Sequence, residues 1–476
     1  MSTPAPASAS ASMPAPAPSA ARNGRDSGLS VPQGTALSVG AVLGTGVITL
    51  PAIAAGVAGP ASLVAWLALV LLSIPLASTF AAMGARFPDS GGVSTYVRRA
   101  FGSKVSAAVG WCFYFAVPVG APPASLMAGG YVADATGSGR GVAVAVAAAL
   151  IVGVGLLNAA GLRLSGRVQL GLTGVLAVLM VVTVVAALPH ADLHHLSPFA
   201  PHGWSAVVPA AAVLVWGFAG WEAVASLAGD YRRPRRDVPR ATAVALAVVG
   251  TLYLALAATT LLVLGPATGG SAAPLSDLLA AGVGGQVRVV TAVTAVLLTI
   301  GAMNAYYAGG SRLGAALARD GALPAWLAAG AGAGQVPRRS LALVAGQSLL
   351  WLAVSEVLHL GLTPLMLLAT GCFTVVYVLG TAAAVRLLPR SSRAWWVAVV
   401  AHASVLLLLA ANGWHVVWAL GVVAAALVHQ VVADRRRGRA VPVPDLPGRH
   451  TPVAGFPHDR DTGRDPGAAG DVLLRA

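Results

Sequence analysis

Long apolar stretches follow one another along this chain with little sequence between them. Each is long enough for a helix that crosses the roughly 30 Å hydrocarbon core of a bilayer. Inside hydrocarbon a chain must satisfy its own backbone hydrogen bonds, so it forms helices or a closed barrel, and stretches of this length predict helices. We expect twelve spans, at residues 34–57, 61–84, 105–132, 141–160, 167–189, 205–228, 240–265, 286–310, 340–358, 361–386, 394–411 and 413–432.

Composition and charge agree with a membrane protein. Of the 476 residues, 57% are apolar and only 10% are charged, which is too little charge for the surface of a soluble protein of this size. With the N-terminus in the cytoplasm, only Arg140 and Arg288 of the 30 Lys and Arg residues fall in outward loops. This asymmetry predicts a multi-pass protein of the cytoplasmic membrane with both ends in the cytoplasm. The net charge of +14 therefore needs no nucleic-acid partner.

The two ends differ from the apolar body, which occupies residues 29–432. Residues 1–28 are dominated by Ala, Pro and Ser and predict a disordered cytoplasmic tail. Residues 433–476 predict a basic cytoplasmic tail. Its arginines next to the last span either attract anionic membrane lipid or only mark the end of that span.

Two of the expected spans are interrupted by glycine. The first contains Gly40, Gly44 and Gly46, and the sixth contains Gly217 and Gly220 at mid-depth. An unwound stretch leaves backbone N–H groups free, and at the start of a half-helix these suit a carboxylate. Gly40 and Gly44 also fit the alternative of close helix packing through a G-x-x-x-G pattern.

The positions of the two interruptions indicate the architecture. Broken helices in first and sixth place are typical of an inverted five-helix repeat with a ligand site at the membrane midplane. We therefore predict an all-α integral membrane protein with repeats at about 34–189 and 205–386, discontinuous helices 1 and 6, and two peripheral helices.

Four side chains near the expected midplane are candidates for function. Glu222 is an acid inside a span, which is costly, and it is either a proton-coupling or gating residue or a structural acid that stabilises the broken helix. Trp216 and Phe218 either cover a ligand or pack and anchor the helix. Asn304 either contacts substrate or forms a hydrogen bond between helices.

No feature predicts catalysis, a metal or a cofactor. Cys112 and Cys372 lie in expected spans and are interpreted as packing residues. The cluster of His190, His194 and His195 lies in a short outward loop and is not interpreted as a metal site. Nucleophile-elbow, zincin and phosphate-loop motifs are absent from suitable contexts. We expect a protein that is not an enzyme.

Four motifs, taken in order, resemble the amino acid–polyamine–organocation superfamily of transporters. They are G-T-G-V-I-T-L-P at the first break, F-P-D-S-G-G-V-S-T-Y-V after the second span, F-A-G-W-E in the sixth, and S-R-L-G-A-A-L-A-R-D-G-A-L-P after the eighth. The run beginning E-A-V-A-S-L-A-G-D-Y-R-R-P-R-R at 222 and the triplet Asn304-Ala305-Tyr306 are similar to the bacterial exporters of methionine and branched-chain amino acids.

The resemblance implies a transporter fold with ten core helices and a set of binding residues. Gly44, Thr45, Gly46 and Val47 would bind the substrate carboxylate. Backbone carbonyls near Trp216, Gly217 and Phe218 would hold the α-amino group, and Trp216 or Phe218 would close over the side chain. Gly220 and Asn304 complete the candidate set.

Ion coupling departs from several members of the superfamily. Sodium-coupled members use neighbouring hydroxyls on the eighth helix, where this chain has only the separated Thr291, Thr294 and Thr299, so no sodium site is expected. The lysine used by some proton-coupled members is also missing, because Lys104 is the single lysine. Proton use would rest on Glu222, or the protein exchanges substrates without an ion.

The sequence therefore predicts a secondary transporter of neutral apolar L-amino acids, working outward by alternating access. The alternative is an uptake permease or exchanger of the same superfamily with another substrate, such as a cationic amino acid or an amine. A membrane sensor or scaffold is a further class, which unchanged phenotypes for Glu222→Gln and Gly46→Leu would support.

Overall fold

The computed structural model describes residues 28–88, 92–161, 166–284, 287–330 and 335–438. In this part of the chain all regular elements are helices, and the only strand-like pairing is a single bridge between Leu29 and Tyr231. Nearly all of the expected N-terminal tail and most of the expected C-terminal tail lie outside the described residues. The residues up to Ala433 form one compact unit, and its packing is described here.

Ten helical segments of the described chain are long and apolar enough to cross a membrane. They coincide with ten of the expected spans, and the two exceptions are the spans at 34–57 and 205–228, in which the glycines predict an interruption. The ten segments are Leu50–Arg86, Ser103–Thr136, Arg140–Ala159, Leu170–His190, Pro234–Gly270, Arg288–Arg319, Arg338–Val357, Leu362–Leu387, Arg393–Ala411 and Gly413–Ala433.

The first expected span consists of three short helices. The helix α1 (Val31–Val42) begins at a capping box in which Gln33 bonds back to Ser30. It is followed by a 3₁₀ helix at Thr45–Ile48 and by α2 (Leu50–Ala58). The ladder of helical hydrogen bonds therefore stops between Val42 and Thr45, next to Gly44.

The other interrupted span runs in two pieces, α8 (Val207–Phe218) and α9 (Glu222–Leu227). Gly220 between them has φ of +126°, a conformation that L side chains rarely adopt. The interruption is therefore built into the sequence at this glycine.

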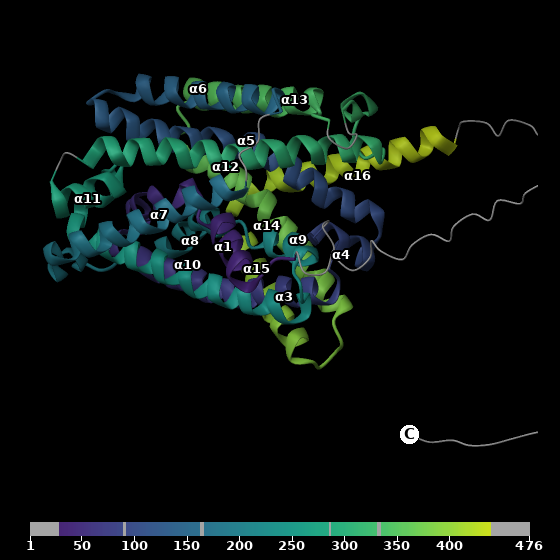
Figure 1. Cartoon of the computed structure of the whole chain (residues 1–476), viewed down its shortest axis with the longest axis horizontal. Coiled ribbons are helices and arrows are strands. Elements are labelled where there is room, and N and C mark those ends of the chain that lie inside the picture. Colours follow the sequence, from purple (N-terminus) through teal and green to yellow (C-terminus); the bar gives the residue numbers. More distant parts are fainter. Residues whose placement is uncertain (1–27, 89–91, 162–165, 285–286, 331–334, 439–476) are drawn as a thin grey trace, which may run out of the picture. The chain divides into compact units, whose positions relative to one another are not determined.

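The remaining helices pack around these two interrupted segments. Helix α5 (Ser103–Thr136) lies against α6 (Arg140–Ala159), α12 (Arg288–Arg319) and α14 (Leu362–Leu387). On the opposite side in Figure 1, α3 (Ser62–Arg86) packs along α10 (Pro234–Leu264). The other α-helices are α4 (Gly92–Phe101), α7 (Gly166–Ala187), α11 (Pro274–Val283), α13 (Arg338–Val357), α15 (Arg393–Ala411) and α16 (Val416–Gly438). Short 3₁₀ helices lie at Gly59–Ala61, Leu188–His190, Leu193–Leu196, Trp204–Ala206, Ala228–Asp230, Gly265–Gly270, Ala325–Ala328 and Gly413–His415.

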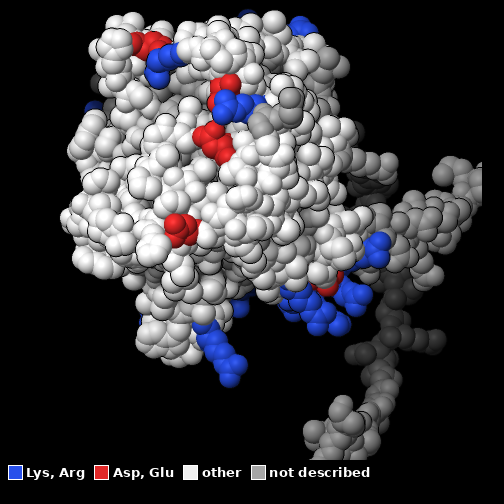
Figure 2. All heavy atoms as spheres, turned by 90° about the vertical axis from the view of Figure 1, so that its left-hand side faces the viewer, with Lys and Arg blue, Asp and Glu red and all other residues white. Residues whose placement is uncertain are grey.

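Both arginines expected in outward loops are paired with carboxylates. Arg140 at the start of α6 donates to both carboxylate oxygens of Glu356 at the end of α13, at 3.0 and 2.7 Å. Arg288 at the start of α12 lies 3.3 Å from Asp134 and 4.0 Å from Asp277. The face of the molecule in Figure 2 is almost wholly neutral, and its charges occur in a few small groups.

Candidate functional site

The end of α1 leaves space at Gly44. The Leu43 N–H bonds to the Val39 carbonyl and the Gly44 N–H bonds to the Val42 carbonyl, which closes the helix. A Cβ placed on Gly44 would meet only the Val42 carbonyl oxygen, at 4.0 Å. The backbone at Gly44 is thus open to a ligand.

The two interruptions lie directly against each other. A Cβ placed on Gly220 would come within 2.5 Å of the Ala41 carbonyl oxygen at the end of α1. A Cβ on Gly217 would come equally close to the side chain of Leu50 in α2. Glycine at both positions lets the α8 and α9 segment contact the first broken span on both sides of its break.

One tyrosine hydroxyl connects the two breaks. The Tyr253 hydroxyl on α10 lies 2.9 Å from the Val42 carbonyl oxygen and 2.8 Å from the Gly217 carbonyl oxygen, so its single proton is shared between them. Its ring is buried against Trp66 and Phe218, with ring centroids 5.4 and 5.2 Å away. Carbonyl groups at helix ends in an apolar interior need donors, and Tyr253 offers one to the two broken helices together.

Glu222 folds back onto the break that precedes it. Its Oε2 accepts the Gly220 N–H at 2.9 Å and the Tyr377 hydroxyl from α14 at 2.5 Å. The Gly220 N–H also points to the Tyr377 oxygen, at 3.3 Å. The carboxyl group therefore satisfies an N–H that the interrupted helix leaves free, and it links α9 to α14.

A cavity of about 680 Å³ lies between the two breaks, within the size range of small-molecule sites. Its lining is apolar apart from Glu222, Thr173 and two tyrosine hydroxyls, and Glu222 is the one acidic or basic residue among the described lining residues. The two breaks contribute Gly44, Gly46, Trp216, Gly217 and Gly220 to the lining. The other walls include Phe113, Val117, Leu298, Met303, Tyr306 and Phe373.

Trp216 is the predicted aromatic residue that lines this cavity. A Cβ on Gly46 would come within 2.4 Å of its indole, and a Cβ on Gly120 within 3.0 Å. Gly46 is therefore a packing position for Trp216. Gly40 is also a packing position, because a Cβ there would meet Thr173 of α7 at 3.0 Å.

Phe218 and Asn304 lie apart from the cavity lining. Phe218 is buried between Trp66 and Tyr253, where it supports the broken helix. Asn304 accepts a hydrogen bond from the Asn158 amide of α6 at 2.9 Å, as in the alternative of a bond between helices. Val47 is buried in the core, and the side chain of Thr45 lies outside the described residues.

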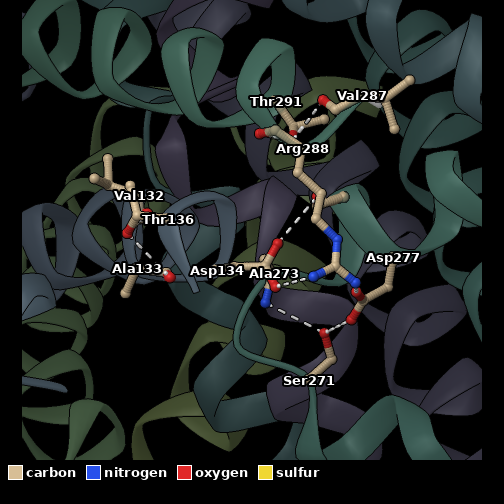
Figure 3. Close-up of polar contacts among 11 residues, drawn as sticks. Val132, Ala133, Asp134, Thr136, Ser271, Ala273, Asp277, Val287, Arg288 and Thr291 are labelled. Atoms are coloured by element: carbon tan, nitrogen blue, oxygen red, sulfur yellow. Dashed lines mark hydrogen bonds and ion pairs between the residues drawn. The ribbon is translucent and has the colours of Figure 1, made fainter. Parts of the chain in front are cut away.

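The cavity lies on one side of the breaks, and polar contacts close the other side. The Tyr131 hydroxyl of α5 donates to the Ile48 carbonyl at 2.6 Å and accepts the Leu275 N–H of α11 at 3.1 Å. Figure 3 shows Arg288 reaching between Asp134 of α5 and Asp277 of α11, with Ser271 donating to Asp277 at 2.6 Å. These bonds hold α5, α11 and α12 together.

Sequence reasoning missed the tyrosines that complete this site. Tyr131, Tyr253 and Tyr377 each lie inside a long apolar stretch and each bonds to one of the interrupted segments. A phenol in an apolar span needs a hydrogen-bonding partner, so their positions were a usable signal. The partner itself is set by how distant helices pack.

Comparison with known proteins gives consistent matches over nearly the whole described chain. The amino acid permease family model matches residues 29–438. The uncharacterized amino acid permease YecA of Bacillus subtilis (strain 168) is 33% identical over 382 residues, which are 80% of this chain and 90% of YecA. The L-methionine/branched-chain amino acid exporter YjeH of Escherichia coli (strain K12) is 31% identical over 400 residues, which are 82% and 93% of the two chains. The branched-chain amino acid permease BcaP of Bacillus subtilis (strain 168) is 27% identical over 311 residues, which are 61% and 66%.

Proposed function

Because this chain belongs to the amino acid permease family of the amino acid–polyamine–organocation superfamily, a family of membrane transporters rather than enzymes, we propose that it exports neutral apolar L-amino acids. The observation that carries the proposal is the cavity between the two interrupted helices, which is apolar apart from one carboxyl group and a few hydroxyls. The methionine and branched-chain substrates of YjeH fit the same chemistry.

The proposed architecture has twelve crossings, of which the broken α1–α2 and α8–α9 segments are the first and sixth. They would occupy equivalent places in inverted repeats at about 34–189 and 205–386, followed by two peripheral helices. The protein would lie in the cytoplasmic membrane with both ends inside. Support comes from the sequence pattern and from the two contacting breaks at Gly44 and Gly220.

The substrate backbone would bind at the breaks. The N–H groups at the start of the Thr45–Ile48 turn would hold the carboxylate, with Gly44 open beside them. The carbonyl groups of Trp216 to Gly220 would accept from the α-amino group, and the Trp216 ring would cover the ligand. We do not assign the side chains of Asn304 or Phe218 to substrate contact, because both are engaged elsewhere.

The walls of the cavity would select the substrate side chain. Phe113, Met303 and Phe373 offer apolar surface, which gains from burying a methionine or leucine side chain at about 25 cal/mol per Å². An arginine or glutamate side chain would lose its hydration there. Glu222, the one acid in the lining, is already hydrogen-bonded to Gly220 and Tyr377.

Glu222 is the proposed proton-carrying group. The sodium alternative has little support, because the Thr291 and Thr294 hydroxyls donate to carbonyls of their own helix. Only the isolated Thr299 hydroxyl then remains of the three candidates on α12. Substrate exchange without an ion is the competing scheme.

In the proposed orientation the cavity faces the cytoplasm, as the loading step of export requires. With both ends in the cytoplasm, part of the cavity lining belongs to the cytoplasmic half of the protein. This part runs from Leu37 to Gly44, before the first break, and from Gly220 to Leu227, after the second break. Substrate would then load from inside, while the contacts of Tyr131 and Arg288 close the outer half.

Transport assays in oriented vesicles test the proposal. Inside-out and right-side-out vesicles would be loaded with labelled methionine, leucine, arginine or glutamate. We expect methionine and leucine to be moved best, and Gly44→Leu or Trp216→Ala to abolish that movement. Gly153→Leu in α6, where nothing lies within 4 Å of a Cβ, is the matched control. Arginine as the preferred substrate would overturn the specificity.

A second measurement tests direction. Cells lacking the gene should accumulate leucine and methionine when the protein is an exporter. Unchanged or lowered internal pools would instead identify uptake.

A further inference from the structure

A groove of about 550 Å³ runs along the outside of the molecule between α3 and α10. The two helices come closest near its far end, where a Cβ on Gly250 would meet Val70 at 2.9 Å. Towards the other end the facing residues are small, namely Ser78 and Ala82 on α3 and Ala243 and Ala247 on α10. Small side chains on both walls leave the space open.

The groove faces the lipid side of the protein. Ile74 in its wall is 47% exposed, and the neighbouring Leu71 and Val244 are 54% and 48% exposed. In a chain that spans a membrane, side chains of this kind meet acyl chains. The groove is therefore open to lipid along its length.

One end of the groove is basic on both walls. Helix positions three and four apart share a face, so Arg86 follows Ala82 on the α3 wall. Arg236 and Arg240 precede Ala243 and Ala247 on the α10 wall. All three arginines are exposed, and no ion pair is formed by any of them among the described residues. An apolar groove thus ends at three arginines that form no ion pair within the described ranges.

We propose that this groove binds one anionic phospholipid, with an acyl chain between α3 and α10 and the phosphate at Arg86, Arg236 and Arg240. The length is suitable: Pro239 to Leu254 covers about 22 Å of helix, and one leaflet is about 15 Å of hydrocarbon. A zwitterionic lipid with the same acyl chain would fit the groove equally well, but it has no net charge to pair with the arginines.

The bound lipid would lie behind the two breaks. Tyr253, which bonds to both interrupted helices, is three residues from Gly250 on the same helix. Trp66 of α3 packs on Phe218 at the second break. A lipid held between the outer faces of α3 and α10 would therefore touch the two helices that support the substrate site from the other side.

Native mass spectrometry of the purified full chain in neutral detergent tests the proposal without any transport assay. The probes are dioleoylphosphatidylglycerol and dioleoylphosphatidylcholine. We expect one tightly bound phosphatidylglycerol and weaker phosphatidylcholine. Each juxtamembrane arginine adds about fivefold to the affinity for an anionic lipid, so Arg236→Gln with Arg240→Gln should lower phosphatidylglycerol affinity about 25-fold.

Matched variants separate a built site from general attraction. Arg390→Gln with Arg393→Gln, at the turn between α14 and α15, removes the same charge away from the groove and should leave binding unchanged. Ala247→Trp should fill the groove and lower binding of both lipids, whereas Ala403→Trp on the exposed face of α15 should not. Equal losses in the two arginine pairs, or no preference between the lipids, would overturn the proposal. If Ala247→Trp does not fold, the arginine pairs still decide.

Discussion

Single hydroxyl and carboxyl groups satisfy the backbone at both interrupted helices. Tyr253 donates to carbonyls at both breaks, Tyr131 donates to the Ile48 carbonyl, and Glu222 accepts the Gly220 N–H. Hydrocarbon offers no such partners. Tyr131 and Tyr253 come from other helices, whereas Glu222 belongs to the interrupted segment itself. The breaks therefore depend in part on tertiary packing to persist.

Replacing Tyr253 by Phe should destabilise the protein by about 1–3 kcal/mol, because the buried Val42 and Gly217 carbonyls lose a donor. Thermal unfolding in detergent measures this loss, and amino acid binding should weaken with it. Tyr114→Phe is the matched control, since it removes a buried hydroxyl that contacts Ser340 and not the breaks. Equal effects on binding would contradict a special role for Tyr253.

Gly220→Ala should be more severe. The new Cβ would lie 2.5 Å from the Ala41 carbonyl, in a backbone conformation that suits glycine alone. We expect a loss of at least about 1–3 kcal/mol in unfolding free energy together with loss of transport. Gly153→Ala, where the Cβ meets nothing, should leave both unchanged. A stable, active Gly220→Ala protein would show that this contact is not needed.

Parts of the site could be predicted from single residues and parts could not. Glu222 stands out because an acid is costly inside an apolar span, and Gly220 stands out by its place beside that acid at the second break. Phe218 and Asn304 look similar in sequence, but their side chains point to other helices. Side-chain direction around an interruption depends on the local backbone, which the pattern of residues does not contain.

At the scale of elements, α11 is held against α5 and α12 by polar contacts. Leu275 bonds to Tyr131, and Arg288 lies between Asp134 and Asp277 (Figure 3). The ion pairs are partly exposed, with Arg288 at 47% and Asp134 at 21%. Exposed ion pairs of this kind contribute about 0–1 kcal/mol to stability. Such a weak contact could open during the proposed transport cycle.

Arg288→Gln should therefore raise the population with an open outer half by up to about fivefold. The measurement is the rate at which an impermeant thiol reagent labels Leu275→Cys, a buried position in α11, in a background without Cys112 and Cys372. Arg140→Gln removes the other outer arginine pair, between α6 and α13, and should not change the rate. An unchanged labelling rate in Arg288→Gln would show that this ion pair does not help to keep α11 closed against α5 and α12.

The elements were predictable in proportion to their length. Ten long apolar helices lie where hydropathy predicts spans, and the family resemblance is confirmed by the comparisons. Hydropathy treats 34–57 and 205–228 as spans like the others, and only the glycines distinguish them. Twelve crossings and the inverted repeat stay predictions, because length and composition do not identify which short helices cross.

At the scale of the whole molecule, proton coupling through Glu222 would set the charge that moves with each amino acid. A methionine or leucine zwitterion has no net charge, and Glu222 is the one acidic or basic residue among the described lining residues. A proton carried on Glu222 would make each cycle move one elementary charge. A transmembrane potential of 100 mV would then contribute about 2.3 kcal/mol, or roughly 50-fold in accumulation.

Clamping vesicles at chosen voltages with valinomycin and potassium makes this consequence measurable. We expect methionine movement to follow voltage in the natural protein and to become independent of it in Glu222→Gln, whose amide oxygen can still accept the Gly220 N–H. Voltage independence in the natural protein would instead identify electroneutral exchange. A single carboxyl group would thus decide whether the membrane potential drives transport by this protein.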